Sequence, residues 1–199
     1  MQTPFPIPQL TDITGLILAG GRASRLQGED KGLILLAGKP LIAYTIERLA
    51  PQVNSILISA NRNRLAYAGY GLPVFADDNA DFNGPLAGML AGLKQCNTPW
   101  LQCVPCDNPR LPDDLVMQLS GRILADTAIA VPRWQGRLQP VYSLLHRSLT
   151  APLEQALKQG HYKVQQWVTE QPHVVVDFPD TAGFFNINTP QDLQRAAQP

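Results

Sequence analysis

Residues 16–41, LILAGGRASRLQGEDKGLILLAGKPL, decide the fold expected for the chain around them. They open with the apolar run LILA at residues 16–19, which is typical of a buried strand. Gly20 and Gly21 follow at once. Two glycines at the end of a strand permit positive φ and let the backbone come close to a ligand. The stretch therefore indicates a strand that leads directly into a binding loop.

This loop carries three cations before the next secondary structure is expected, namely Arg22, Arg25 and Lys31, and no carboxylate precedes Glu29. Exposed backbone N–H groups cradle phosphate oxygens, and Arg and Lys side chains neutralise the charge on them. We therefore expect the loop to bind a triphosphate. A solvated surface loop rich in Gly and Arg is the alternative interpretation.

Two common phosphate-binding motifs are absent from this region. The dinucleotide fingerprint G-x-G-x-x-G fails because the third glycine is missing after Gly20 and Gly21. The P-loop pattern G-x-x-x-x-G-K-[ST] fails because Pro40 follows Lys39, where the Mg²⁺-binding hydroxyl belongs. The loop must therefore bind phosphate in another way.

Length and charge favour one domain that acts on a small molecule. The chain has 199 residues, and its 16 basic and 16 acidic side chains give a formal net charge of zero. This balance provides no field for nucleic acid or an anionic membrane, and no apolar run approaches the ~20 residues of a membrane span. The first residues lack the pattern of a secretory signal. We expect residues 1–12 to form a flexible tail, and residues 13–199 to form one cytoplasmic domain.

The three cysteines favour a reducing compartment, because their number is odd. Cys103 and Cys106 have the spacing of a thioredoxin motif, but Cys103 lies inside an apolar run and no clean helix start follows Cys106. A redox function is therefore the weaker interpretation. The three histidines show no metal-ligand spacing.

Strands and helices alternate along the rest of the chain. Strands are expected at residues 53–59, 72–76, 100–104, 127–131, 139–145 and 173–178. Helices are expected at residues 41–49 with Pro40 in their first position, at 62–68, from Pro85, at 113–125, at 148–159, and from Pro190 after an N-cap at Thr189. This order predicts an α/β fold, a single three-layer αβα domain with a Rossmann-like, mostly parallel central sheet.

Polar residues follow three of these strands at their carboxyl ends, at Asn61, Asp77 and Asp107. Ligands of open α/β sheets bind at this edge. Asp107 lies between Pro105 and Pro109, and an aspartate fixed after a buried strand is a suitable ligand for Mg²⁺. The alternatives are a turn-forming role for Asp107 and a helix cap or solvated loop at Asp77.

The string LAGGRASRLQGEDKGLILLAGKPLI resembles the signature LAGG-x-x-x-R-[ML]-G-x-x-x-K-G of the molybdenum cofactor guanylyltransferases, which have a GT-A-like, nucleotide-diphospho-sugar transferase-like fold. Later segments match that family in the same order, with PLAG at residues 85–88, PCD at 105–107 and N-x-N-T-P at 186–190. The resemblance covers nearly the whole chain after about residue 12.

The resemblance implies that the N-terminal half binds GTP and the C-terminal half binds molybdopterin. GMP would pass from GTP to the terminal phosphate of molybdopterin with Mg²⁺ as cofactor, and no strong general base is required because that phosphate is already anionic. Proteins that deliver and accept the cofactor are the further partners, and we expect a monomer.

The site residues that the resemblance implies fall into three groups. The catalytic residues are Arg25, Lys31 and Asp107, with Asp107 also the metal ligand. The nucleotide-binding residues are Leu18, Ala19, Gly20, Gly21, Arg22, Lys31, Ser59, Asn61, Asp77, Gly84 and Asp107. The candidates on the pterin side are Lys163, Asn186 and Asn188.

Several of these roles have alternatives. The family usually has Asn at the Ser59 position, so Asn61 is a nearby substitute. The carboxylate of Asp77 can accept from guanine N1–H and N2–H₂ together. PLAG favours guanine over cytosine, or serves close helix packing. The loop at residues 133–137 receives the pterin or is an exposed hairpin, and Lys163 contacts phosphate or is solvated.

The rival functions are a molybdopterin cytidylyltransferase, a sugar-phosphate nucleotidyltransferase and a non-catalytic nucleotide-binding subunit. A panel of nucleoside triphosphates separates the first two from a guanylyltransferase. The third predicts GTP binding without release of pyrophosphate.

Overall fold

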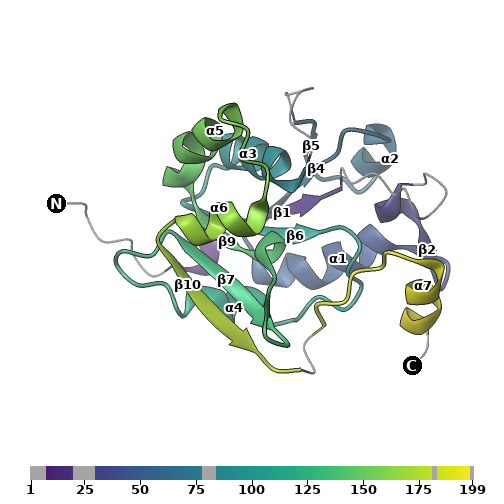
Figure 1. The fold of residues 1–199 in the computed structure, drawn as a ribbon. Helices are drawn as coiled ribbons and strands as arrows, with labels where there is room; N and C mark the ends of the chain where they lie inside the picture. Colours follow the sequence, from purple (N-terminus) through teal and green to yellow (C-terminus); the bar gives the residue numbers. More distant parts are fainter. Residues whose placement is uncertain (1–7, 20–29, 78–83, 181–182, 198–199) are drawn as a thin grey trace.

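A computed structural model describes residues 8–19, 30–77, 84–180 and 183–197 (Figure 1). Within these residues, one eight-stranded sheet has the order β5-β4-β1-β6-β9-β7-β10, with β8 paired to β7. The strands of this sheet are β1 (Ile13–Leu18), β4 (Ser55–Ser59), β5 (Val74–Phe75), β6 (Trp100–Pro105), β7 (Ile129–Trp134), β8 (Arg137–Leu138), β9 (Leu144–His146) and β10 (His173–Phe178). A separate hairpin pairs β2 (Leu35–Leu36) with β3 (Lys39–Pro40).

Six strands of this sheet share one direction. Strand β1 is parallel to β4 and β6, β4 is parallel to β5, and β7 is parallel to β10. Strand β9 is antiparallel to both β6 and β7, so β6 and β7 run the same way. The carboxyl ends of β5, β4, β1, β6, β7 and β10 therefore meet at one edge, which is where ligands of such sheets bind.

Helices cover both faces of the sheet (Figure 1). They are α1 (Leu41–Leu49), α2 (Arg64–Ala68), α3 (Pro85–Gln95), α4 (Leu115–Ser120), α5 (Thr150–Lys158), α6 (Val164–Glu170) and α7 (Pro190–Ala196). One buried cluster holds side chains of α1 and α4, and a second holds side chains of α3, α5 and α6. The predicted three-layer α/β fold is confirmed. No helix in the described part of the chain is long and apolar enough to cross a bilayer.

Helix α3 lies unusually close to β1 because two glycines face that strand. A Cβ added at Gly92 would lie 2.5 Å from Leu16 Cδ2, and one at Gly88 would lie 2.7 Å from Leu18 Cδ2. A Cβ at either position would force these leucine side chains to shift, so both glycines allow the close packing of α3 on β1. The structure therefore supports the packing explanation for the small residues of the PLAG segment.

The N-terminal half follows the predicted order with local differences. Helix α1 spans residues 41–49 as predicted, but Pro40 precedes it in β3, where it pairs with Leu35. Helix α2 begins at Arg64 and not at residue 62, because Asn63 has a left-handed φ of 47°. Residues 1–7 lie outside the described part, while Leu10–Asp12, expected in the tail, form a 3-10 turn before β1.

The C-terminal half also differs from expectation in two places. A strand was predicted at residues 139–145, but a 3-10 turn occupies Pro140–Tyr142. Only the end of the predicted strand therefore lies in β9. Helix α4 is shorter than the predicted 113–125. Strand β10 has the predicted limits, and α7 begins with the predicted cap, in which Thr189 Oγ1 accepts from the backbone N–H of Asp192.

Candidate functional site

Lys31 and Asp107 meet at the edge where the parallel strands end. Asp107 follows β6, and Lys31 begins a 3-10 turn at Lys31–Leu33. Lys31 Nζ lies 3.1 Å from Asp107 Oδ2, although 76 residues separate the two in sequence. The predicted convergence of this cation and this carboxylate is therefore confirmed.

The carboxylate of Asp107 is buried and only half satisfied. The residue is 5% exposed, its Oδ2 accepts from Lys31, and among the described residues its Oδ1 has no hydrogen-bond partner. Burial raises the pKa of this carboxyl group, and the charge of Lys31 opposes that change. A buried acceptor without a donor is costly unless a cation or solvent completes it. The free oxygen therefore fits a metal ligand.

Asp107 belongs to no larger cluster of metal-ligating side chains among the described residues. In the described ranges, no group of three or more His, Cys, Asp or Glu side chains is arranged to hold a metal ion. Mg²⁺ is often bound by one or two carboxylates, with phosphates and waters completing the octahedron. The arrangement therefore suits a metal that arrives with its nucleotide.

The segment before α7 is fixed against Asp107. The backbone N–H of Ile187 donates to the carbonyl oxygen of Asp107 over 2.9 Å. Lys31 Nζ also donates to Asn188 Oδ1 over 2.5 Å. The carboxylate of Asp192 accepts from the backbone N–H groups of Asn188 and Thr189 and so holds the segment from the helix side. The structure thus brings Asn188 to Lys31, while its contact with substrate stays a prediction.

Asn186, by contrast, directs its side-chain oxygen inward. Tyr142 donates its hydroxyl hydrogen to Asn186 Oδ1, and Asn108 Nδ2 donates to the same hydroxyl oxygen over 2.9 Å. Asn108 Nδ2 also donates to the carbonyl of Gly183 over 2.7 Å. Burial raises the pKa of Tyr142, so its hydroxyl remains a donor. Sequence reasoning missed Asn108 and Tyr142, because nothing local distinguishes them from turn and strand residues.

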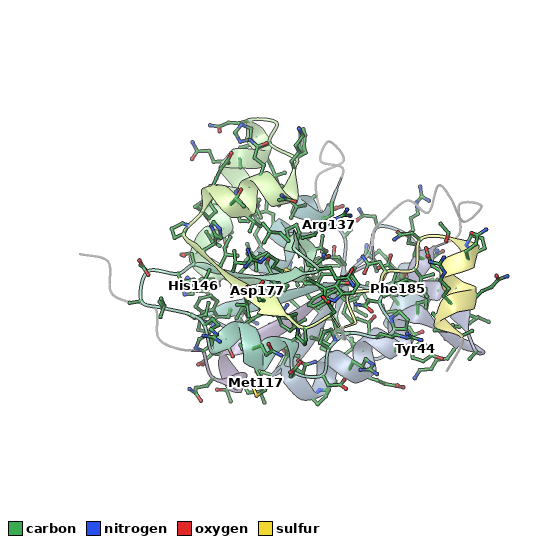
Figure 2. The ribbon with its side chains drawn as sticks, turned by 60° about the horizontal axis from the view of Figure 1, so that its bottom comes forward. Tyr44, Met117, Arg137, His146, Asp177 and Phe185 are labelled. Atoms are coloured by element: carbon green, nitrogen blue, oxygen red, sulfur yellow. The ribbon has the colours of Figure 1, made fainter. Side chains whose placement is uncertain are left out.

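The same face of the molecule carries an apolar cluster that anchors α7. Leu36, Leu41 and Ile187 form its buried core, and Tyr44 and Phe185 pack against it. Figure 2 shows Tyr44 and Phe185 on the side of the molecule where α7 lies. This packing fixes the C-terminal segment relative to the start of α1, and therefore relative to Lys31.

The predicted nucleotide side lies at the ends of β1, β4 and β5. Leu18 is in register with Ser59, and the N–H of Ala19 donates to the carbonyl of Ser59 over 2.8 Å. Ser59 is buried, and its Oγ would lie 3.1 Å from a Cβ placed on Gly88. The hydroxyl therefore faces α3, and its contact with a nucleotide stays a prediction.

Two further nucleotide candidates lie beside each other. Asn61 is exposed after β4, and its Oδ1 accepts from the backbone N–H of Asp77 over 3.1 Å. Gly84 has φ 135° before the first residue of α3, which confirms the predicted turn. The remaining candidates of the loop lie outside the described residues, and they are Gly20, Gly21, Arg22 and Arg25.

The predicted pterin side is less well assembled. Lys163 is exposed just before α6. Arg133 was expected at a hairpin tip, but it lies in β7 and pairs with Asp177 of β10 at 2.6 and 2.7 Å. Arg137, labelled with Asp177 in Figure 2, lies in β8 and is exposed, as Arg133 also is. The guanidinium of Arg133 is therefore already held by a carboxylate.

The cysteines do not form a redox site. All three are free and buried, and burial raises the pKa values of the Cys103 and Cys106 thiols. A redox-active thiol needs the opposite, a lowered pKa with solvent access. The structure therefore argues against the thioredoxin interpretation.

Comparisons with known proteins show which family the chain resembles. A family model described as the MobA-like NTP transferase domain matches residues 15–174. A molybdenum cofactor guanylyltransferase from Ralstonia nicotianae is 46% identical over 198 residues, covering 94% of this chain and 97% of the relative. One from Cupriavidus necator is 48% identical over 189 residues, covering 92% and 95%.

Solved structures resemble the fold. Molybdopterin-guanine dinucleotide biosynthesis protein A from Archaeoglobus fulgidus aligns with a TM-score of 0.75 at 25% identity, over 92% of this chain and 96% of that one. A CMP:2-keto-3-deoxy-manno-octonic acid synthetase complexed with CTP aligns with a TM-score of 0.70 at 15% identity, over 94% of this chain and 97% of that one, which shows the fold alone.

Proposed function

The chain belongs to the MobA-like NTP transferase family, and on that premise we propose that it transfers GMP from GTP to the terminal phosphate of molybdopterin. An oxygen of the pterin phosphate attacks the α-phosphorus of GTP. The bond between the α-phosphorus and the bridging oxygen of the β-phosphate breaks, and pyrophosphate leaves. The observation that carries the proposal is the 3.1 Å contact between Lys31 and Asp107 at the carboxyl edge of the sheet.

Lys31 supplies positive charge where the leaving group becomes more negative. Its side chain is 20% exposed, so its ammonium can reach a triphosphate without leaving the neighbourhood of Asp107. The second acceptor, Asn188 Oδ1, restricts the directions in which the ammonium points. Charge placed in advance at such a position lowers the barrier because no reorganisation is required during the reaction. The pterin phosphate is itself largely ionised at neutral pH, so it needs no general base.

Asp107 is the residue of this chain that would hold Mg²⁺. Its buried Oδ1, which accepts no hydrogen bond from the part of the chain that the structure describes, supports that role. When bound, Mg²⁺ supplies a Lewis acid that neutralises the transferring phosphate. The chain itself fixes the direction of the carboxylate, because the carbonyl oxygen of Asp107 accepts from Ile187 N–H and Oδ2 accepts from Lys31.

The selection of guanine rests on Asp77 and Asn61. Asn61 Oδ1 holds the backbone N–H of Asp77, so the end of β5 is tied to the end of β4. A carboxylate at this position accepts two hydrogen bonds from the Watson–Crick edge of guanine, whereas cytosine offers one exocyclic amine. The names of the relatives from Ralstonia nicotianae and Cupriavidus necator support the same choice.

A panel of nucleotides tests the function. Purified protein is mixed with molybdopterin, Mg²⁺ and each of the four nucleoside triphosphates, and release of pyrophosphate is measured. GTP is expected to be the substrate that reacts. Reaction with CTP would identify a cytidylyltransferase, reaction only with a sugar phosphate as acceptor would identify a sugar-phosphate nucleotidyltransferase, and GTP binding without pyrophosphate would identify a non-catalytic subunit.

The setting of the enzyme follows from the same proposal. It acts in the cytoplasm as a monomer, receives molybdopterin from a delivering protein and passes the dinucleotide to an accepting enzyme. The three free, buried thiols suit a reducing compartment. Size-exclusion chromatography with light scattering tests the monomer.

A further inference from the structure

Asp30 directly precedes Lys31, yet its carboxylate is bound away from Asp107. Tyr67 of α2 donates its hydroxyl hydrogen to Asp30 Oδ1. Asn63 Nδ2 donates to Asp30 Oδ2 over 3.1 Å. Both carboxylate oxygens are therefore held by residues from the segment that follows β4. None of these three residues belongs to the groups assigned above to substrate or metal.

Tyr67 also packs against Gly32, the residue that follows Lys31. It is fully buried, and a Cβ added at Gly32 would lie 2.6 Å from its hydroxyl oxygen and 3.3 Å from Cys106 Sγ. The hydroxyl is therefore packed directly beneath the backbone of Gly32. Burial raises the pKa of Tyr67, so the group remains protonated and can donate.

These contacts fix the backbone on both sides of Lys31, at Asp30 and at Gly32. Asp30 and Gly32 are the direct neighbours of Lys31 in the chain, so these anchors bear on the position of its ammonium group. Charge-assisted hydrogen bonds to a carboxylate are the stronger kind and confer defined geometry. A lysine with four rotatable side-chain bonds gains most from a fixed backbone.

We propose that Tyr67 and Asn63 are positioning residues for the nucleotidyl transfer, which act by binding Asp30 and so directing Lys31 toward Asp107 and the triphosphate. This inference rests on the proposed function. Neither residue touches the reacting atoms. Their effect reaches the chemistry through the backbone of residues 30–32 alone.

The same turn also reaches the predicted base side. Residues 60–63 connect β4 with α2, and they contain Asn61, which accepts from Asp77, as well as Asn63, which donates to Asp30. Asn63 has φ 47°, a conformation that Asn tolerates better than most residues. One short turn therefore links the end of β5, where guanine is expected, to the catalytic lysine.

The first test removes the hydroxyl of Tyr67 and nothing else. Tyr67→Phe is expected to lower kcat by about 10- to 100-fold, because small displacements of a catalytic group have effects of this size. The KM for GTP should change much less, since the interaction that is lost acts on the transition state. The matched control is Tyr70→Phe, because Tyr70 is a nearby, half-buried tyrosine that forms no hydrogen bond with Asp30 in the described structure, and it should keep wild-type kcat.

The second test exchanges donor and acceptor between Asp30 and Asn63. Asn63→Asp places a carboxylate against a carboxylate and should be slow, whereas Asp30→Asn leaves two amides that can still form a hydrogen bond but lose its charge-assisted strength. The double variant restores the pair in reverse, and Asp is also tolerated at a left-handed φ. Its kcat is expected to exceed that of Asn63→Asp, which is the non-additivity of a direct interaction. A double variant no faster than the slower single variant would contradict the pairing.

A third readout does not depend on turnover. Lys31 in substrate-free protein is labelled with a small amine-reactive reagent, and the rate is measured by mass spectrometry with Lys94 as internal reference. Lys94 pairs with Glu154 between α3 and α5 and should react equally in all variants. Tyr67→Phe should accelerate labelling of Lys31 several-fold, because the contact between Lys31 Nζ and Asp107 Oδ2 loosens.

The outcomes separate the two proposals. A wild-type protein that releases no pyrophosphate from GTP with molybdopterin would overturn the proposed function, while the labelling of Lys31 would still decide the positioning role. Wild-type kcat and wild-type labelling in Tyr67→Phe would overturn the positioning role. If thermal melting shows that Tyr67→Phe is unstable, Asn63→Asp is tested in its place, because Asn63 is exposed.

Discussion

Replacement of Asp107 by asparagine should separate activity from stability. The wild-type carboxylate has one oxygen 3.1 Å from Lys31 Nζ, and one buried oxygen to which residues 8–19, 30–77, 84–180 and 183–197 donate no hydrogen bond. Asp107→Asn preserves the shape and leaves an amide oxygen as acceptor for Lys31, but it removes the negative charge. We expect guanylyl transfer to fall by about 10²- to 10³-fold, a typical loss when a charged group of a transfer site is removed.

Although Asp107→Asn should lower activity, it should raise the free energy of unfolding. An unsatisfied buried acceptor costs about 1–3 kcal/mol, and a hydrogen bond to a charged partner contributes about 1.5–3 kcal/mol, so the two effects nearly cancel in the wild type. Burial is the larger influence on the pKa of Asp107, and it raises that pKa. The net environment therefore disfavours the charge. Asp107→Asn should stabilise the metal-free protein by about 1 kcal/mol at pH 7, or ~2–4 °C in Tm.

The pH dependence of Tm provides a second test of the prediction that Asp107→Asn is more stable than the wild type. Because the pKa of Asp107 in the folded protein lies above its ordinary value of 3.8, the contribution of the carboxyl group to stability is fully present below pH 3.8 and is lost as the pH rises through the folded pKa. The Tm advantage of the variant should therefore be small in acid, grow as the pH rises and then remain constant. Thermal melting in a chelating buffer measures this.

The matched control is Asp113→Asn. Asp113 is an exposed carboxylate that pairs with Arg48 at 2.7 Å, and its loss should leave turnover unchanged. The reasoning would be refuted by an Asp107→Asn protein that melts several degrees below the wild type at pH 7. It would also be refuted by one that retains wild-type transfer.

Three other outcomes follow from packing, capping and burial. Gly92→Ala places a methyl group 2.5 Å from Leu16 Cδ2, so urea unfolding should show a loss of about 1–3 kcal/mol, and an unchanged midpoint would show that α3 moves freely. Thr189→Ala removes the cap that accepts from Asp192 N–H and should cost about 1 kcal/mol together with part of kcat, whereas Thr189→Ser should behave as wild type. All three thiols should resist a thiol-specific reagent in the native protein and react in denaturant, and rapid labelling of native protein would contradict their burial.

The sequence was sufficient for features that depend on local chemistry or on strand order. The cap at Thr189 follows from the adjacent Pro190 and Asp192, and it was confirmed. The meeting of Lys31 with Asp107 was expected from the resemblance to the guanylyltransferases, which assigns both residues to one triphosphate, and the structure brings them within 3.1 Å. Such features need no knowledge of how helices pack.

Contacts that depend on how distant elements pack together could not be predicted from the sequence. The contact between Tyr67 and Asp30 joins residues 37 positions apart, and it exists because α2 packs beside the end of β4. The contact between Tyr142 and Asn186 likewise requires the turn that interrupts the predicted strand. The pairing of Arg133 with Asp177 likewise depends on the register of β7 with β10, which places the two residues opposite each other. In each case a side chain of ordinary appearance gained its role from a distant partner.

The transfer of label from the α-phosphorus of GTP to molybdopterin tests the central claim most directly. Wild-type protein and Lys31→Ala are incubated with Mg²⁺, molybdopterin and GTP that is radiolabelled at the α-phosphorus. We predict label in the pterin product of the wild type, and transfer slower by about 10²- to 10³-fold in Lys31→Ala. Absence of labelled pterin, or equal rates for the two proteins, would contradict the account.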